Sequence, residues 1–192
     1  MIEKIFVSEV RVRLLKELIL SDEEDLHVRE LTRRIKTEVN AVRRELDNLE
    51  SIKLVIRVPR GNKVFYSINR THTLFPELLG MIGKEYGLGK KLLASYKSLG
   101  DVKFVTLRRG YIEGVKSKNK KEVDLLMIGK IDIEKAEKLI NEEEERSNTQ
   151  INFSVFDFDE LNFRKERKDP FLMGILLTPK VMIVGSEEEL TA

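Results

Sequence analysis

The sequence predicts a protein of the α/β (α+β) class in three parts: a helical N-terminal domain ending in a hairpin (residues 1–72), a helical connector (73–99) and a small C-terminal domain on a mixed sheet (100–192). Three observations predict this organisation. Apolar residues recur at helical spacing through the first fifty residues, and two β-rich runs around a Pro/Gly/Asn turn follow them. From residue 101 onward, strand-like and helix-like runs alternate, which is typical of a small sheet covered by helices.

Composition limits the kind of protein that this chain can be. With 192 residues, 41% of them hydrophobic, it can bury a real core. No apolar run approaches the roughly 18 residues of a membrane span, and the start M-I-E-K does not resemble a secretory signal, so we expect a cytoplasmic protein without a membrane partner. The absence of cysteine and the presence of only His27 and His72 argue against a disulfide framework or a zinc site, and both histidines are expected to be structural or surface residues. The 35% of charged residues, rich in Glu and Lys, is typical of thermophilic proteins.

Two helices are predicted at the start of the chain. The first runs from Ser8, its expected N-cap, to Leu20, and the acidic loop 21–25 follows it. Asp22 or Asp25 is expected to cap the second helix, residues 26–36, whose apolar stripe lies one short turn before Thr37. Arg11 and Arg13 on the first helix either contact DNA that flanks the main site or belong to a solvated face.

The stretch T-E-V-N-A-V-R-R-E-L-D-N-L, residues 37–49, predicts a helix that could read DNA. Thr37 is the expected N-cap, and Val39, Val42, Leu46 and Leu49 share one buried face. The opposite face presents amide, guanidinium and small groups near the helix start, where a recognition helix meets base edges. The candidate base-reading residues are Thr37, Asn40, Ala41, Arg43 and Arg44.

Residues 54–58 and 63–69 read as the two strands of a hairpin around the turn 59–62. Its basic and amide side chains, Arg57, Arg60, Asn62 and Lys63, suit contact with phosphates. Two helices, a third helix and a basic hairpin in this order are the signature of a winged helix-turn-helix. Charge agrees, because residues 27–70 hold 11 Lys/Arg against 5 Asp/Glu, whereas residues 71–192 hold 20 against 21.

The connector predicts helices over 75–86 and 89–99, and their apolar surplus, including Leu79 and Leu92, predicts burial against a second chain in a homodimer. In the C-terminal domain, strands are expected over 102–107, 122–128, 151–155 and 181–184, and helices over 133–145, 158–165 and 171–177.

The C-terminal residues also carry a family resemblance. The segment G-Y-I-E-G at 110–114, a variable basic loop and K-E-V-D-L-L-M-I-G at 121–129 resemble the signature of the minimal nucleotidyltransferases of the DNA polymerase beta superfamily, and residues 153–161 and 169–185 are also similar. In the first half, H-V-R-E-L-T-R-R-I, N-A-V-R-R-E-L and G-N-K-V-F-Y-S-I-N resemble the ArsR-like winged helix that is fused to such modules in archaeal proteins.

The resemblance implies a site that this chain does not complete. Active members hold a triphosphate at a Gly-Ser helix start and two Mg²⁺ ions on Asp-x-Asp and a third acidic residue. The corresponding positions here are Arg109-Gly110, Glu122-Val-Asp124 and Asn152. Glu122 and Asp124 are expected on one strand face, which leaves one weak Mg²⁺ site open, but two-metal catalysis does not follow. We expect no catalytic residue and no cofactor, with Mg²⁺ and a nucleotide triphosphate as the alternative. The basic loop, with Lys116, Lys118, Lys120 and Lys121, either binds an anion or is solvated, and the solvated loop is favoured.

Three functions of different classes follow. The favoured one is a transcriptional regulator that binds double-stranded DNA, with an inactive nucleotidyltransferase-like domain used for dimerisation or for sensing a small nucleotide-like ligand. The second is an active Mg²⁺-dependent nucleotidyltransferase of the antitoxin type. The third is an adaptor that binds protein through its winged helix. Charge focusing favours the first over the third, and the incomplete signature favours it over the second.

Overall fold

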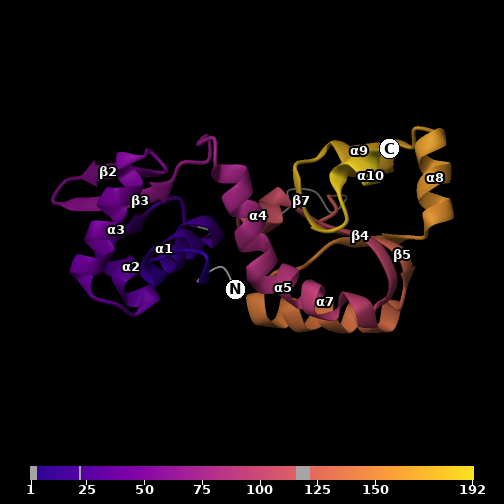
Figure 1. The fold of residues 1–192 in the computed structure, drawn as a ribbon, viewed down its shortest axis with the longest axis horizontal. Coiled ribbons are helices and arrows are strands. Elements are labelled where there is room, and N and C mark those ends of the chain that lie inside the picture. Colours follow the sequence, from indigo (N-terminus) through magenta and orange to yellow (C-terminus); the bar gives the residue numbers. More distant parts are fainter. Residues whose placement is uncertain (1–3, 22, 116–121) are drawn as a thin grey trace. The chain divides into compact units, whose positions relative to one another are not determined.

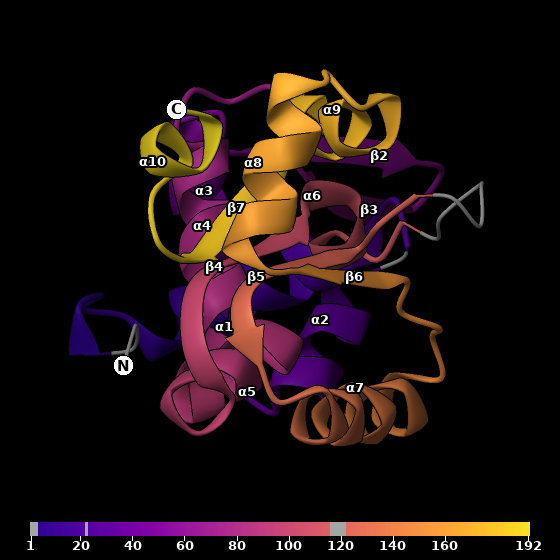
Figure 2. The same ribbon diagram turned by 90° about the vertical axis from the view of Figure 1, so that its right-hand side faces the viewer.

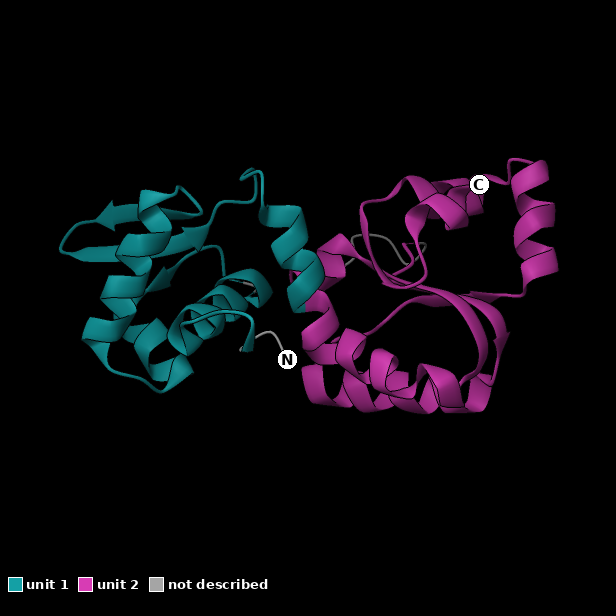
Figure 3. Cartoon of the chain, in the orientation of Figure 1, with its two compact units in different colours: residues 1–82 teal, residues 83–192 magenta. Residues whose placement is uncertain are grey.

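The structure is a computed structural model that describes residues 4–21, 23–115 and 122–192 (Figure 1). It confirms a mixed α+β class with two separate sheets. The chain divides into two compact units, residues 1–82 (unit 1) and 83–192 (unit 2), which Figure 3 colours separately. Their boundary lies inside helix α4 (Phe75–Glu85), within the predicted connector. The predicted division at residues 72 and 99 stays a prediction.

Unit 1 begins with three helices, α1 (Glu9–Leu20), α2 (Val28–Ile35) and α3 (Val39–Ser51). Ser8 is the N-cap of α1 as predicted, since its hydroxyl accepts a hydrogen bond from the Arg11 amide at 3.2 Å. The apolar faces that the sequence pattern predicts pack together, because each helix offers a stripe at 3.6-residue spacing. Their buried residues are Val12, Leu14, Leu15, Leu18 and Ile19 of α1, Val28, Leu31 and Ile35 of α2, and Val42, Leu46 and Leu49 of α3.

A three-stranded antiparallel sheet completes unit 1. The hairpin consists of β2 (Val55–Arg60) and β3 (Lys63–Ile68), and β3 also pairs with β1 (Leu26–His27), a strand that the sequence pattern does not predict. Arg60 pairs with Lys63, so the turn is Gly61-Asn62 alone, shorter than the expected 59–62. Gly61 has φ of +59°, which suits glycine at the first position of a two-residue hairpin turn. Pro59 can belong to β2 because β2 is an edge strand.

Two predicted helix caps are wrong. Helix α3 begins at Val39 with Glu38 as its N-cap, and Thr37 instead belongs to the turn, where its amide donates to the Thr32 carbonyl at 3.3 Å. The turn takes this form because Lys36 adopts a left-handed conformation (φ 51°) that ends α2. The cap of α2 is His27, whose Nδ1 accepts from the Arg29 amide at 3.2 Å, and not Asp25; Asp22 lies outside the described residues.

The predicted helices of the connector are α4 and α5 (Gly87–Ser95), and a 3-10 turn (Tyr96–Ser98) follows α5. Leu79 and Leu92 are 2% and 0% exposed. Burial within the single chain therefore explains these two leucines without a second copy.

Unit 2 is built on a mixed sheet in the order β6-β5-β4-β7, formed by β4 (Gly100–Arg108), β5 (Leu125–Ile131), β6 (Phe153–Phe156) and β7 (Lys180–Val184). Only β5 and β6 are parallel. Figure 2 shows α5 and α7 (Ile133–Ser147) on one side of the sheet, and α8 (Phe158–Glu166), α9 (Pro170–Leu177) and α10 (Glu187–Thr191) on the other. The short helix α6 (Arg109–Ile112), which was not predicted, follows β4 directly. One core cluster comprises Phe104, Leu126, Ile128, Phe156, Leu161, Leu172 and Leu190.

Candidate nucleic-acid interface

Helix α3 is fixed by its buried side and presents polar groups on the other. Val42 and Leu46 are fully buried, so the helix cannot rotate without opening the core of unit 1. Asn40, Arg43 and Arg44 are exposed, as the helical spacing predicts. Thr37 and Ala41 are half-buried. The side chains that the sequence assigns to base reading therefore form an accessible surface, with Asn40, Arg43 and Arg44 as its most exposed members.

A groove of about 630 Å³ lies between α3, the hairpin and the start of α2. Four of its lining side chains are cationic and come from three elements: Arg29 of α2, Arg43 of α3, and Arg57 and Lys63 of the hairpin. Within the described part of the chain, none of these four has an ion-pair partner. Asn62 lines the groove too. An anionic strand entering it would meet cations from both sides.

Two acidic side chains, Asp47 and Glu50 of α3, line the same groove. They reduce its formal charge from +4 to +2. A carboxylate beside a phosphate strand is unfavourable, but it can accept a hydrogen bond from the amino group of cytosine in a major groove. The groove is therefore suited to a duplex with both phosphates and base edges, more than to a simple anion.

The groove brings together only part of the predicted DNA-binding set. Arg43, Arg57, Asn62 and Lys63 line it, whereas Thr37, Asn40, Ala41, Arg44 and Arg60 do not. Arg29 and His27 line it and were missed by the sequence reasoning. A signal for Arg29 was available, since it is an exposed arginine in the first turn of α2, but only the fold brings that turn beside the hairpin.

Arg60 differs from the other hairpin cations because it has partners inside unit 1. Its guanidinium pairs with Asp25 at 2.5 Å and lies over the Phe65 ring at 5.2 Å. Phe65 in turn meets His27 edge to face, with ring centroids 5.6 Å apart. The contacts of Arg60 therefore brace the hairpin against the segment before α2, which was not predicted from sequence.

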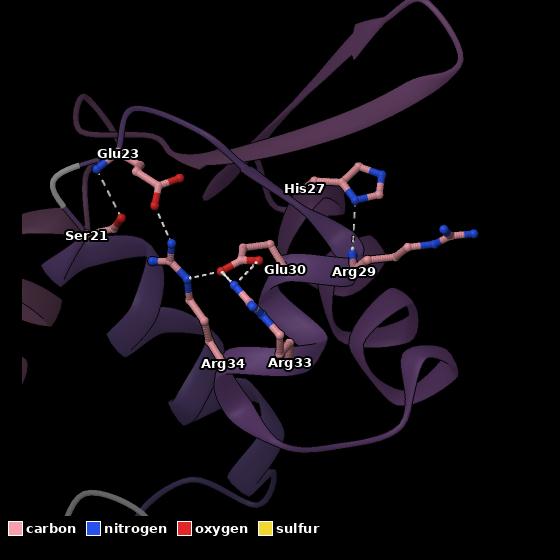
Figure 4. Close-up of polar contacts among 7 residues, drawn as sticks. All are labelled: Ser21, Glu23, His27, Arg29, Glu30, Arg33 and Arg34. Atoms are coloured by element: carbon pink, nitrogen blue, oxygen red, sulfur yellow. Dashed lines mark hydrogen bonds and ion pairs between the residues drawn. The ribbon is translucent and has the colours of Figure 1, made fainter.

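A second set of arginines is neutralised on α2 (Figure 4). Both Glu30 oxygens lie 2.8 Å from an Arg33 nitrogen, Arg34 donates to Glu30 at 2.7 Å, and Arg34 also pairs with Glu23. The hydrogen bonds from Arg33, and then those from Arg34, lower the pKa of the Glu30 carboxyl. The Glu30 contact likewise raises the pKa of Arg34. The positive charge of unit 1 is therefore partly cancelled here, and the four groove cations remain.

Arg11 holds α1 to the middle of α3. Its Nε lies 2.9 Å from a carboxylate oxygen of Glu45, and the Ser8 hydroxyl donates to the other at 2.8 Å. Burial works against ionisation of Glu45, but the hydrogen bonds from Ser8 and Arg11 outweigh it and keep the pKa of this carboxyl below its usual value. Glu45 is 5% exposed, so this ion pair fixes α3 against α1. Arg13 pairs with Glu9 on the helix surface at 3.1 Å.

The residues of the nucleotidyltransferase resemblance lie in unit 2, but not as the sequence placed them. Strand β5 begins at Leu125, so Glu122 and Asp124 precede it and do not share a strand face as expected. Asp124 is 2% exposed and pairs with Arg108, not with Arg109. Arg109 pairs with Glu113 at 3.2 Å, and Gly110 lies within α6. Asn152 meets Asp124 through its backbone. The basic loop with Lys116, Lys118, Lys120 and Lys121 lies outside the described residues.

A separate polar cluster, unnoticed in the sequence, surrounds Glu143 of α7. This carboxylate is 2% exposed and lies 3.0 Å from Lys91 and 2.5 Å from Arg146. Burial opposes its ionisation, yet the hydrogen bonds from Arg146 and Lys91 keep its pKa below the usual value. Burial, and then the negative charges of Glu143 and Asp124, raise the pKa of the Tyr111 phenol. These groups satisfy one another, and no group of three or more metal-ligating side chains occurs among the residues that the structure describes.

None of the described helices is long and apolar enough to cross a membrane. No protein-family model matches the chain, and no curated protein matches it in sequence. Among solved structures it is similar to a mutant of MarR from E. coli, with 16% identity and a TM-score of 0.33 over 50% of this chain and 79% of that chain. It is also similar to human N-acetylserotonin methyltransferase in complex with SAM, with 18% identity and a TM-score of 0.31 over 62% of this chain and 36% of that chain. Both TM-scores are too low to assign a function.

Proposed function

We propose that the protein is a transcriptional regulator that binds double-stranded DNA through unit 1. In this proposal α3 meets base edges through Asn40, Arg43 and Arg44, and the groove beside it receives a phosphate strand. The observation that carries the proposal is the convergence of four cations without ion-pair partners, from α2, α3 and the hairpin, on one groove. The neighbouring arginines of α2 are neutralised by Glu23 and Glu30, so the charge is focused and not spread evenly.

The order of elements supports the same proposal. Helices α2 and α3 are joined by a turn of three residues, and the hairpin that follows α3 pairs with β1 beside the start of α2. This is the arrangement of a winged helix-turn-helix, in which a recognition helix enters the major groove and a wing lies on the backbone. The short hairpin turn at Gly61-Asn62 leaves Asn62 and Lys63 at its tip, where they can contact phosphates.

The remaining parts of the proposal concern unit 2 and assembly. We propose that unit 2 is a scaffold for dimerisation or for a small ligand, in a cytoplasmic protein. A dimer would place two recognition helices on paired half-sites. Sedimentation of the full chain at micromolar concentration tests assembly. The burial of Leu79 and Leu92 means that a charge at either position would damage the fold, so neither substitution can serve as a test of the dimer.

The function is tested by fluorescence anisotropy of the full chain with labelled duplexes from the region upstream of its own gene. A scrambled duplex of equal length and composition is the matched control. We expect binding to both that weakens with salt, and tighter binding to the upstream DNA, because phosphate contacts give general affinity and base contacts give preference. Absence of binding to either duplex at about 50 mM salt, where phosphate contacts are strongest, would refute the proposal.

A further inference from the structure

The strongest polar centre of unit 2 is the buried carboxylate of Asp124. Arg108 donates to its Oδ1 from Nε at 2.8 Å, and the Nη2 atom of Arg108 lies 2.7 Å from the same oxygen. Its Oδ2 accepts the backbone amide of Asn152 at 3.1 Å. The side chains of Asp124 and Arg108 are 3% and 11% exposed. Both carboxylate oxygens are thus engaged, and the charge is balanced inside the protein.

The surroundings of Arg108 hold its guanidinium in this position. Nη2 also donates to the carbonyl of Val115 at 3.2 Å, and Nη1 lies 3.7 Å from Glu122. A Cβ atom at position 110 would clash with the Arg108 guanidinium, so glycine at 110 leaves the space that this side chain occupies. Arg108 therefore joins the end of β4, the segment after α6 and the residues that lead into β5.

A divalent metal of the kind that the nucleotidyltransferase resemblance implies does not fit these residues. Mg²⁺ needs oxygen ligands at about 2.0–2.1 Å in octahedral geometry. Here Asp124 already has a cation on one oxygen and an amide on the other, and Asn152 faces it with its backbone. A metal ion near Asp124 would also be repelled by Arg108. Two-metal chemistry requires several free carboxylates around two ions, which this centre does not provide.

We propose that Arg108 is the resident cation of this centre and takes the place that a divalent metal ion would need beside Asp124. The guanidinium neutralises the buried carboxylate and fixes the approach to β5, so the centre stabilises unit 2 and excludes metal-dependent nucleotidyl transfer. The sequence alone pointed to Arg109 as the residue that disrupts the site, whereas the structure assigns this role to its neighbour. The proposal does not depend on DNA binding by unit 1.

The proposal predicts that removal of Arg108 creates a site for a divalent cation. Arg108→Ala leaves a buried carboxylate without its partner, which is strongly destabilising in proteins. A cation that binds only the folded state raises stability by mass action. In thermal unfolding of the full chain, we expect Arg108→Ala to lower the midpoint, and millimolar Mn²⁺ at constant ionic strength to raise it again by about 2–4 °C or more. The natural protein should show no such shift.

Three variants serve as controls. Arg109→Ala removes the adjacent arginine, which pairs with Glu113, and should not create a response to Mn²⁺. The double variant Arg108→Ala, Asp124→Asn lacks the carboxylate and should also not respond. Arg108→Lys keeps a positive charge beside Asp124, and we expect it to fold and to remain insensitive to Mn²⁺.

A Mn²⁺-dependent rise in the natural protein that Asp124→Asn abolishes would overturn the proposal. So would an Arg108→Ala variant that folds but does not respond to Mn²⁺. If Arg108→Ala does not fold, paramagnetic broadening of the Leu125 amide in the natural protein decides: broadening by Mn²⁺ refutes the exclusion of metal, and an unchanged signal supports it. These readouts involve no DNA, so their failure is distinguishable from failure of the proposed function.

Discussion

Removal of two groove cations should change the salt dependence of DNA binding by an amount that the structure specifies. Arg43 and Lys63 line the groove from opposite sides, one on α3 and one on the hairpin. Each phosphate contact contributes about 0.9 to the slope of log affinity against log salt. If the four groove cations each neutralise one phosphate, the natural protein should have a slope of about −3.6, and the double variant Arg43→Ala, Lys63→Ala a slope of about −1.8.

The corresponding loss of affinity is readily measured. Between about 50 and 200 mM salt, a slope of −3.6 weakens binding about 150-fold, whereas a slope of −1.8 weakens it only about 12-fold. Anisotropy of a labelled duplex across this range gives both slopes. The two variants of each pair must first show the far-UV circular dichroism and thermal midpoint of the natural protein, which is expected because Arg43 and Lys63 are exposed and unpaired within the described residues.

A matched control separates the groove from total charge. The double variant Arg33→Ala, Lys53→Ala also removes two positive charges from unit 1, and neither residue lines the groove. Arg33 already pairs with Glu30. We expect its slope to stay within about 0.5 of the natural value, since no phosphate contact is lost. If this control lowers the slope as much as the groove variant does, binding responds to net charge only, and the reasoning from the groove is wrong.

Three other predictions concern base reading, pH and the core. Asn40→Ala and Arg44→Ala should each relax preference at particular base pairs by about 1–3 kcal/mol in a competition assay; equal weakening on every duplex would contradict base reading. The folded-state pKa of Glu45 is lowered, so its contribution to stability is present above its unfolded-state pKa and is lost as pH falls through the folded-state value. Glu45→Gln should therefore flatten the acid side of the profile of unfolding free energy against pH, and an unchanged profile would argue against this role. Leu79→Asp should cost several kcal/mol, about 3–5, by burying an unpaired charge, and a folded variant with the natural midpoint would show that Leu79 is not a core residue.

Periodicity in the sequence was sufficient to predict most helices of both units. Helix α1 and helix α7 begin within a residue or two of the expected positions, because apolar spacing and capping residues are local signals. The hairpin followed in the same way from β-rich runs around Gly61. The exposed face of α3, and with it the candidacy of Arg43, could also be read from the sequence, because a buried stripe on a helix determines which residues lie opposite it.

Tertiary structure alone decided the contacts between distant segments. Strand β1 is only two residues long and exists because β3, about forty residues later, pairs with it. Arg29 became a groove residue because this pairing brings the start of α2 beside the hairpin, and Arg60 was diverted to Asp25 for the same reason. Sequence patterns carry no information on such pairings, since each depends on where another segment packs.

The same limit explains the error of one residue at the centre of unit 2. Arg108 and Arg109 are adjacent and chemically identical, and a motif comparison places Arg109 at the disrupted position. Their roles were decided by backbone geometry: β4 ends at Arg108, so its side chain turns to Asp124, while Arg109 begins α6 and reaches Glu113 one helical turn later. The sequence determined which charges are available in this protein, and the end of a strand determined which of them meet.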